Sequence, residues 1–318
     1  MSICLFIPLR KELNYAKTVL NEFGQLATKK SSVVPYNFKG LLFKKRLKIS
    51  VCLIDDMGNW PTAAYVAWAL GALKPKIAIL AGIAGSLDAK ALPVGSVVAS
   101  YRAKTIYANK IKKRSEREVF VDEYLSSADG KIQVDRREKV FTDSFFRNKR
   151  RYYDPLPMEE EFSKIIEEIR TRCMSVGLPP EVSSVISGIK IGQIFSGDLV
   201  IDCEEAVQYI SDKIKDDTLD YYRQKDMLDS ADGNASYIRA DWDFEPASAV
   251  DMESAGFLHA IQIAEATVTP FIVRGISDVC AQKNDNHQEL AARNAIVSAL
   301  AVAEMAYNHG AVIPGLND

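Results

Sequence analysis

Polar side chains that could do chemistry follow an apolar run late in the sequence. Within residues 270–280 (PFIVRGISDVC), the run leads into Arg274, and Ser277 and Asp278 follow at once. A carboxylate placed behind a buried strand is costly unless a partner or a ligand uses it. Asp is also a favoured helix cap. The segment therefore predicts either a cap or an acid that acts on a ligand.

Four other segments repeat this pattern of an apolar run that ends in a turn with a polar residue. In α/β sheets, ligand sites lie beyond the carboxyl ends of the strands, where residues from distant parts of the chain meet. Taken singly, each segment is explained by a plain turn, or by an acid in the first turn of a helix, as well as by a ligand site. Taken together, they predict one shared pocket built from residues 8–12 (PLRKE), 81–87 (AGIAGSL), 196–201 (SGDLVI) and 250–254 (VDMES).

Strand and helix patterns alternate along the chain. Such alternation is typical of an α/β layered fold, which we expect here as a single domain over residues 1–318. Strands are predicted at residues 3–9, 49–54, 77–81, 94–100, 189–195 and 269–273, and helices at 13–23, 63–73 and 288–307.

Two charged segments interrupt the alternation, and we interpret them as surface insertions at about 102–188 and 202–247. The first is rich in Lys and Arg and the second in Asp and Glu. The basic segment is either a solvated face or a surface that meets phosphate groups or a second subunit. Its candidate phosphate contacts, together with two basic residues near the N-terminus, are Arg10, Lys11, Arg147, Lys149, Arg150 and Arg151.

Composition excludes several classes of function. The 318 residues carry a net charge of −2, which gives no field directed at nucleic acid or an anionic membrane. The longest apolar stretch, at 77–85, is too short to span a bilayer, and we find no signal peptide. Five scattered cysteines without a CxxC pair suit reduced thiols in a cytoplasmic protein. The three histidines form no zinc-binding pattern, so we expect no metal.

Five motifs in order resemble the nucleoside phosphorylase/nucleosidase superfamily, especially its methylthioadenosine/S-adenosylhomocysteine nucleosidase branch. The resemblance covers about residues 1–101 and 189–308. It implies a three-layer α/β/α fold with a central mixed sheet and large insertions. The motifs are Glu12, Gly82-Ile83-Ala84-Gly85, Ser196-Gly197-Asp198-Leu199-Val200-Ile201, Asp251-Met252-Glu253 and Arg274-Gly275-Ile276-Ser277-Asp278.

The resemblance also implies a reaction, the cleavage of the bond between a nucleobase and ribose. Asp278 would protonate N7 of a purine, and burial would raise its pKa for this role. Glu253 would bind the ribose hydroxyls, and Glu12 would orient or deprotonate the attacking water with help from Arg274. The remaining contacts with the substrate would come from Ile83, Ala84, Gly85, Val200, Ile201, Met252 and Ser277. No cofactor is implied.

Departures from the family pattern leave alternatives open. Ile83 replaces a Ser or Thr and cannot donate a hydrogen bond to phosphate, which favours water as the nucleophile. The Pro8-Leu9-Arg10 segment resembles that of some phosphorylases and keeps a purine nucleoside phosphorylase as the alternative. Val200 replaces the usual aromatic residue beside the base. A third interpretation is a nucleoside-binding protein without turnover.

A short stretch at residues 283–292 resembles a branch that serves in immune and stress systems. With the basic residues named above, it suggests a 5′-phosphorylated purine such as AMP or ATP as substrate. We also expect a homo-oligomer in which the two charged insertions meet at an interface or roof the pocket.

Overall fold

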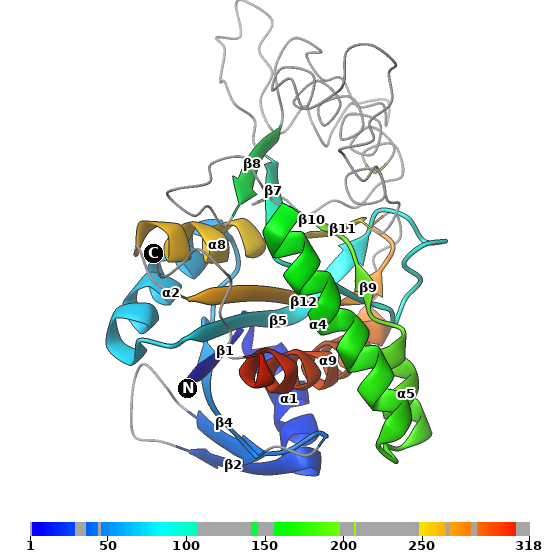
Figure 1. Ribbon diagram of the computed structural model, residues 1–318. Helices are drawn as coiled ribbons and strands as arrows, with labels where there is room; N and C mark the ends of the chain where they lie inside the picture. The colour runs from blue at the N-terminus through cyan, green and yellow to red at the C-terminus, as the bar shows by residue number, and fades with distance from the viewer. Residues whose placement is uncertain are drawn as a thin grey trace, which may run out of the picture.

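Two long strands form the centre of a mixed sheet in the computed structural model (Figure 1). β5 (Ile77–Ser86) and β12 (Thr269–Asp278) pair in parallel along their whole length. Both are apolar and buried for most of that length rather than alternating, as expected for strands covered on both faces. This pair fixes the frame on which the other elements assemble.

The structure describes most of the chain outside the charged segments. The residues described are 2–28, 36–43, 46–106, 141–145, 156–197, 207, 248–264, 268–280 and 285–309.

Twelve strands make up the sheet within these residues. On one side of β5, parallel β1 (Ile3–Ile7) and β4 (Leu47–Leu53) extend the sheet, followed by antiparallel β3 (Tyr36–Gly40) and β2 (Gly24–Thr28). β5 also pairs antiparallel with β11 (Ser248–Asp251), which leads to β10 (Gln193–Ser196), β7 (Arg102–Ile106) and β8 (Phe141–Phe145). The remaining edge of β12 carries antiparallel β6 (Val97–Ser100), beside which lies β9 (Lys190–Ile191).

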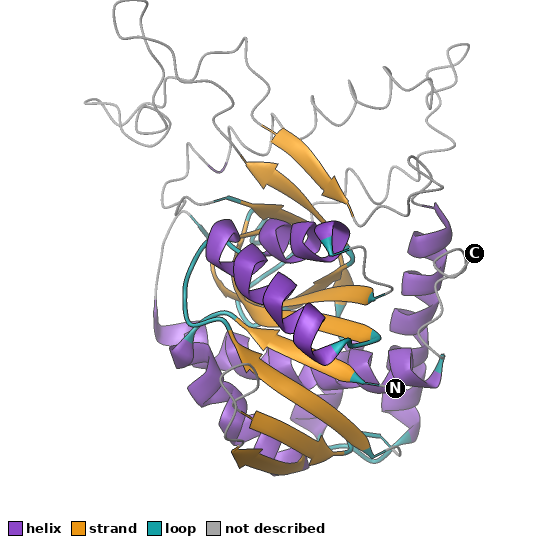
Figure 2. Ribbon diagram, turned by 90° about the vertical axis from the view of Figure 1, so that its left-hand side faces the viewer, coloured by secondary structure: helices purple, strands orange, loops and turns teal. Residues whose placement is uncertain are grey.

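Helices cover both faces of the sheet, which confirms the three-layer α/β/α fold (Figures 1 and 2). Alternate residues of β5 point to opposite faces, so Ile79 packs into one apolar core and Leu80 into the other. The first core includes α1 (Arg10–Phe23), α4 (Leu156–Ser175), α5 (Pro180–Ser187) and α9 (Gln288–Asn308). The second includes α2 (Asn59–Leu73) and α8 (Ser254–Ile263).

Parts of the expected insertion at 102–188 belong to these layers. Phe162, Ile166 and Ile169 of α4 are buried in the first core, and residues 102–106 and 141–145 form paired strands β7 and β8. Most of the charged sequence between these elements, and nearly all of 202–247, lies outside the described residues. The insertions themselves therefore stay predictions. No described helix is both long and apolar enough to cross a membrane.

The segment Gly82-Ile83-Ala84-Gly85 was predicted to be a turn, and this is wrong. It is the second half of β5, because β12 continues beside it to Asp278 and pairs Gly82 with Arg274. The glycines do not end the strand. They keep its surface free of side chains where a pocket opens.

Candidate active site

A pocket opens at the carboxyl ends of β5 and β12, beside the end of β11. It collects residues from five parts of the chain that are distant in sequence. Its lining consists of Pro8, Leu9, Glu12, Met57, Ile83, Ala84, Gly85, Val250, Asp251, Met252, Glu253, Ser277, Asp278, Cys280, Asp285 and Gln288.

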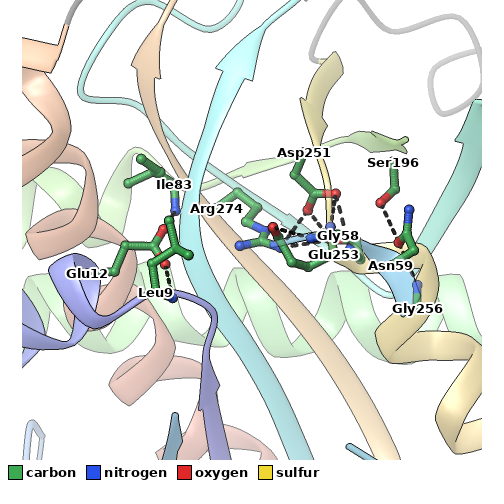
Figure 3. Close-up of polar contacts among 11 residues, drawn as sticks. Leu9, Glu12, Gly58, Asn59, Ile83, Ser196, Asp251, Glu253, Gly256 and Arg274 are labelled. Atoms are coloured by element: carbon green, nitrogen blue, oxygen red, sulfur yellow. Dashed lines mark hydrogen bonds and ion pairs between the residues drawn. The ribbon is translucent and has the colours of Figure 1, made fainter. Parts of the chain in front are cut away.

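Glu12 is held in the first turn of α1 by two backbone groups (Figure 3). The Leu9 N–H donates to Glu12 Oε2 at 3.0 Å, and the Ile83 N–H donates to Oε1 at 2.8 Å. The carboxylate is buried. Burial raises its pKa, while Arg274 and the two N–H groups act in the opposite direction. A carboxylate with a raised pKa is a better proton acceptor at neutral pH.

Arg274 is fully buried beneath the pocket and joins two carboxylates. Its Nη2 lies 2.7 Å from Asp251 Oδ2 and 3.2 Å from Glu253 Oε2. Burial acts to lower the pKa of Arg274, but Asp251 and the two glutamates offset this and raise it. A Cβ at Gly82 would lie 2.5 Å from Arg274 Nη1 and 2.9 Å from Glu12 Oε1. The glycine therefore lets Arg274 approach Glu12 as well.

Glu253 lies at the start of α8, and its pKa is strongly shifted. Burial raises it to about 8. Arg274 opposes the shift, whereas the nearby carboxylates Asp251 and Glu12 add to it. The Gly58 N–H also approaches Glu253 Oε1, at a long 3.5 Å. Gly58 has a φ of 105°, a left-handed conformation that favours glycine. Burial therefore favours the protonated form of this carboxyl group, which can both donate to and accept from a hydroxyl.

Asp278 ends β12 and lines the pocket. Ser277 Oγ donates to Asp278 Oδ2 at 2.7 Å and also lies 3.3 Å from the Ala84 carbonyl oxygen. A Cβ at Gly85 would lie 3.1 Å from Asp278 Oδ1 and 2.4 Å from Cys280 Sγ. Gly85 therefore lets the end of β5 pack closely against this acid.

The structure brings together most of the residues predicted for the site. Arg274 lies behind the lining, whereas Arg10 and Lys11 do not reach it. Arg10 instead pairs with Asp55 on the surface, and Lys11 is exposed. Val200, Ile201, Arg147, Lys149, Arg150 and Arg151 lie outside the described residues. Those that line the pocket are Glu12, Ile83, Ala84, Gly85, Met252, Glu253, Ser277 and Asp278.

Sequence reasoning missed two residues that position this machinery. Asp251 accepts hydrogen bonds from the backbone N–H groups of Glu253 and Ser254 at the start of α8, and so fixes the place of Glu253. Asn59 Oδ1 accepts from the Gly256 N–H at 2.7 Å and from a buried serine of β10 at 3.0 Å. The position of Asp251, just before a helix, could have indicated its role from the sequence. No local sequence pattern indicated a role for Asn59.

Carboxylic acids dominate the chemistry of the pocket, with the buried Arg274 behind its lining. Among the described residues that line it, none is Lys or Arg. No group of three metal-binding side chains occurs in the described part of the chain. The arrangement can transfer protons and bind hydroxyl groups. The described lining has no cationic side chain that could bind an anion such as phosphate.

Comparison with known proteins identifies the fold. No family model matches the sequence, and no curated protein matches it. Among solved structures, futalosine hydrolase of Helicobacter pylori matches with a TM-score of 0.53 and 15% identity, over 95% of this chain and 97% of that one. This chain has a nucleoside phosphorylase/nucleosidase fold.

Two further structures with this fold contain ligands. The 5′-methylthioadenosine/S-adenosylhomocysteine nucleosidase of Neisseria meningitidis, in complex with methylthio-immucillin-A, matches at 18% identity and a TM-score of 0.53, over 96% of this chain and 99% of that one. A mutant nucleosidase of H. pylori with 5′-methylthioadenosine in its active site matches at 15% identity and a TM-score of 0.55, over 95% and 98% of the two chains. The resemblance read from the sequence motifs is confirmed at the level of the fold.

Proposed function

We propose that the chain hydrolyses the N-glycosidic bond of a purine nucleoside. One observation carries the proposal: Glu12, Glu253 and Asp278 converge on a single pocket from α1, the start of α8 and the end of β12. Cleavage of this bond needs a proton donor for the base, groups that hold the sugar hydroxyls and an activated nucleophile. Three acids around one pocket can fill those roles, which also speaks against a protein that only binds a nucleoside.

Each acid takes the role that the family resemblance implies. Asp278 donates a proton to N7 as the bond between the base and C1′ breaks. Glu253, whose pKa is raised by burial, exchanges hydrogen bonds with the ribose hydroxyls. Glu12 takes a proton from water as the water oxygen bonds to C1′, and its burial and raised pKa favour that uptake. The products are a free base and a free sugar.

Water is favoured over phosphate by the same geometry. A phosphate dianion requires cationic or N–H donors, but Arg274 is buried behind the pocket lining, where its Nη2 pairs with Asp251 and Glu253. Arg10 pairs with Asp55 at the surface. The Ile83 N–H is already donated to Glu12. A phosphorylase therefore remains the second candidate.

A phosphorylated substrate is a finer proposal that rests on the sequence. The described pocket lining offers no lysine or arginine to a 5′-phosphate. The basic residues from Arg147 to Arg151 lie outside the described part, and they carry this hypothesis together with the immune-branch resemblance. Nucleosides are consequently the primary proposal.

The test is a substrate panel assayed by chromatography of the released base. Adenosine, methylthioadenosine, AMP and ATP are each incubated with and without phosphate, using the unmodified protein and the Asp278→Asn variant. We expect base release without phosphate, and a loss of about 10²–10⁴-fold in turnover for the variant. Strict dependence on phosphate would favour the phosphorylase.

Three further outcomes are informative in the same panel. Full activity of Asp278→Asn, with an unchanged melting temperature, would remove Asp278 from the mechanism. Preference for AMP or ATP, abolished by charge reversal at Arg147, Lys149, Arg150 and Arg151, would support the nucleotide proposal. If methylthioadenosine is the best substrate and the reversals change no rate, the nucleotide proposal fails while the hydrolase proposal stands.

A further inference from the structure

Two polar residues line the pocket without a role in the proposed reaction. Asp285 begins the short 3-10 helix η2 (Asp285–His287), and Gln288 begins α9. Gln288 Nε2 donates a hydrogen bond of 2.6 Å to Asp285 Oδ1. Both residues belong to the stretch 283–292, whose resemblance suggested a nucleotide as substrate. The structure therefore brings part of that stretch to the pocket.

The hydrogen bond between these two side chains fixes what they offer to a ligand. A carboxylate only accepts hydrogen bonds and has about four lone-pair sites, of which Gln288 occupies one. Because the –NH2 group of Gln288 points to Asp285, the Gln288 Oε1 atom and a second N–H are not used in this bond. Asp285 is exposed and Gln288 is half-buried. The pair thus presents several acceptors, one donor and a negative charge at the mouth of the pocket.

The geometry of a nucleoside indicates which of its groups reaches this pair. In a β-nucleoside, the base and C5′ project from one face of the ribose, and the 2′ and 3′ hydroxyls project from the other. Glu253 and Glu12 serve the second face in the proposed reaction, because they bind the hydroxyls and the attacking water. η2 packs against β12, which ends at Asp278, so it lies on the side of the base. With the base held by Asp278, the 5′ group is left to meet the exposed pair.

We propose that Asp285 and Gln288 bind the 5′ group of the substrate and select purine nucleosides that carry a 5′-hydroxyl, an inference that rests on the proposed hydrolase function. A hydroxyl can donate to Asp285 and accept from the second N–H of Gln288. A thioether sulfur has no hydrogen to donate and accepts only weakly. A 5′-phosphate brings negative charge to a lining with five carboxyl groups and, among the described residues, no Lys or Arg.

A purely structural role for the pair makes a different prediction. A negative charge near the beginning of a helix stabilises that helix, so Asp285 also contributes to the stability of α9. If this were its whole role, its replacement would lower the melting temperature and leave the order of substrates unchanged. The order of substrates is therefore the decisive measurement.

The first experiment compares kcat/KM for adenosine, 5′-deoxyadenosine, methylthioadenosine and AMP, with the released base followed by chromatography. The unmodified protein is expected to prefer adenosine to 5′-deoxyadenosine by about 10–100-fold, the range for a hydrogen bond to a charged group. Asp285→Asn removes the charge and should raise kcat/KM for AMP relative to adenosine by roughly 5–10-fold. Gln288→Leu removes the amide and should reduce the preference for adenosine over methylthioadenosine by about 3–10-fold.

Glu289→Gln is the matched control for these variants. Glu289 is an exposed acid in the first turn of α9, and it does not belong to the pocket lining. This variant should keep the substrate order of the unmodified protein.

A binding measurement separates this inference from the proposed function. When a carbon–carbon bond joins the base to the sugar, there is no N-glycosidic bond to hydrolyse, so such analogues of adenosine report binding without turnover. Isothermal titration calorimetry compares analogues that carry a 5′-hydroxyl, a 5′-hydrogen or a 5′-phosphate. We expect the 5′-hydroxyl form to bind most tightly, and Asp285→Asn to reduce its advantage over the 5′-phosphate.

The two experiments together distinguish the possible failures. If the analogues bind in the expected order but no substrate releases its base, the hydrolase proposal fails and the 5′-hydroxyl selection stands. If base is released, the hydrolase proposal stands, and three results would each overturn the selection. These are equal kcat/KM for adenosine and 5′-deoxyadenosine, a preference for AMP, or variants at Asp285 and Gln288 that keep the order of the unmodified protein. Binding of none of the analogues would overturn the selection as well.

Discussion

The shifted pKa of Glu253 predicts a specific dependence of stability on pH. The pKa of this carboxyl group is about 8 in the folded protein, against an ordinary value of 4.5. Between these values the folded state holds a proton that the unfolded state has lost. The contribution of this proton to the free energy of unfolding is therefore complete below the unfolded-state pKa. It is lost as the pH rises through the folded-state pKa. Replacement by Gln removes the titration and keeps the shape.

The magnitude follows from the two pKa values. Each pH unit inside the window costs about 1.4 kcal/mol for one proton. Between about pH 5 and about pH 8, the free energy of unfolding of the unmodified protein should fall by roughly 3–4 kcal/mol relative to that of Glu253→Gln. The variant is expected to be relatively more stable at the alkaline end, although it loses a partner of Arg274.

The assay is urea unfolding followed by circular dichroism at a series of pH values. Glu289→Gln, a change at an exposed glutamate of α9, is the control and should keep the pH dependence of the unmodified protein. Parallel curves for the unmodified protein and Glu253→Gln would refute the reasoning, because they would mean that Glu253 titrates alike in the folded and unfolded states.

Two further variants test how the site is held. Gly82→Ala places a methyl group 2.5 Å from Arg274 Nη1; we expect a loss of about 1–3 kcal/mol in unfolding experiments and a lower kcat, and a variant with native stability and activity would contradict that close contact. Asn59→Ala leaves the buried Gly256 N–H without its acceptor and should cost about 1–3 kcal/mol; an unchanged melting temperature would show that the contact contributes nothing.

The sequence predicted the layers of the fold more accurately than the limits of its elements. The apolar runs located β5 and β12, but both strands continue beyond the predicted ends because each supplies the other's backbone partners. The helix predicted at 63–73 begins at Asn59. Pro61 lies in the first turn of this helix, where proline is tolerated because its missing N–H is not needed.

The acids of the site were predictable, but their mutual contacts were not. Glu12, Glu253 and Asp278 each belong to a short motif that can be read locally. The ion pair between Arg274 and Asp251 depends on how β11 and β12 flank β5, and that register is set by long-range pairing. No local pattern encodes such a distance. The same holds for the hydrogen bonds of Asn59 with β10 and α8.

The central pairing of β5 with β12 has a consequence for biosynthesis. A ribosome completes β5 early, yet β12, its long parallel neighbour, emerges only after most of the chain has been made. α9, which packs against both strands, follows later still. Arg274 and Asp278 arrive with this last portion, and the buried carboxylates have no counter-charge from Arg274 before then. Nascent chains that end before β12 therefore lack both the completed central pair of strands and the pocket, so a chain interrupted there should have no activity.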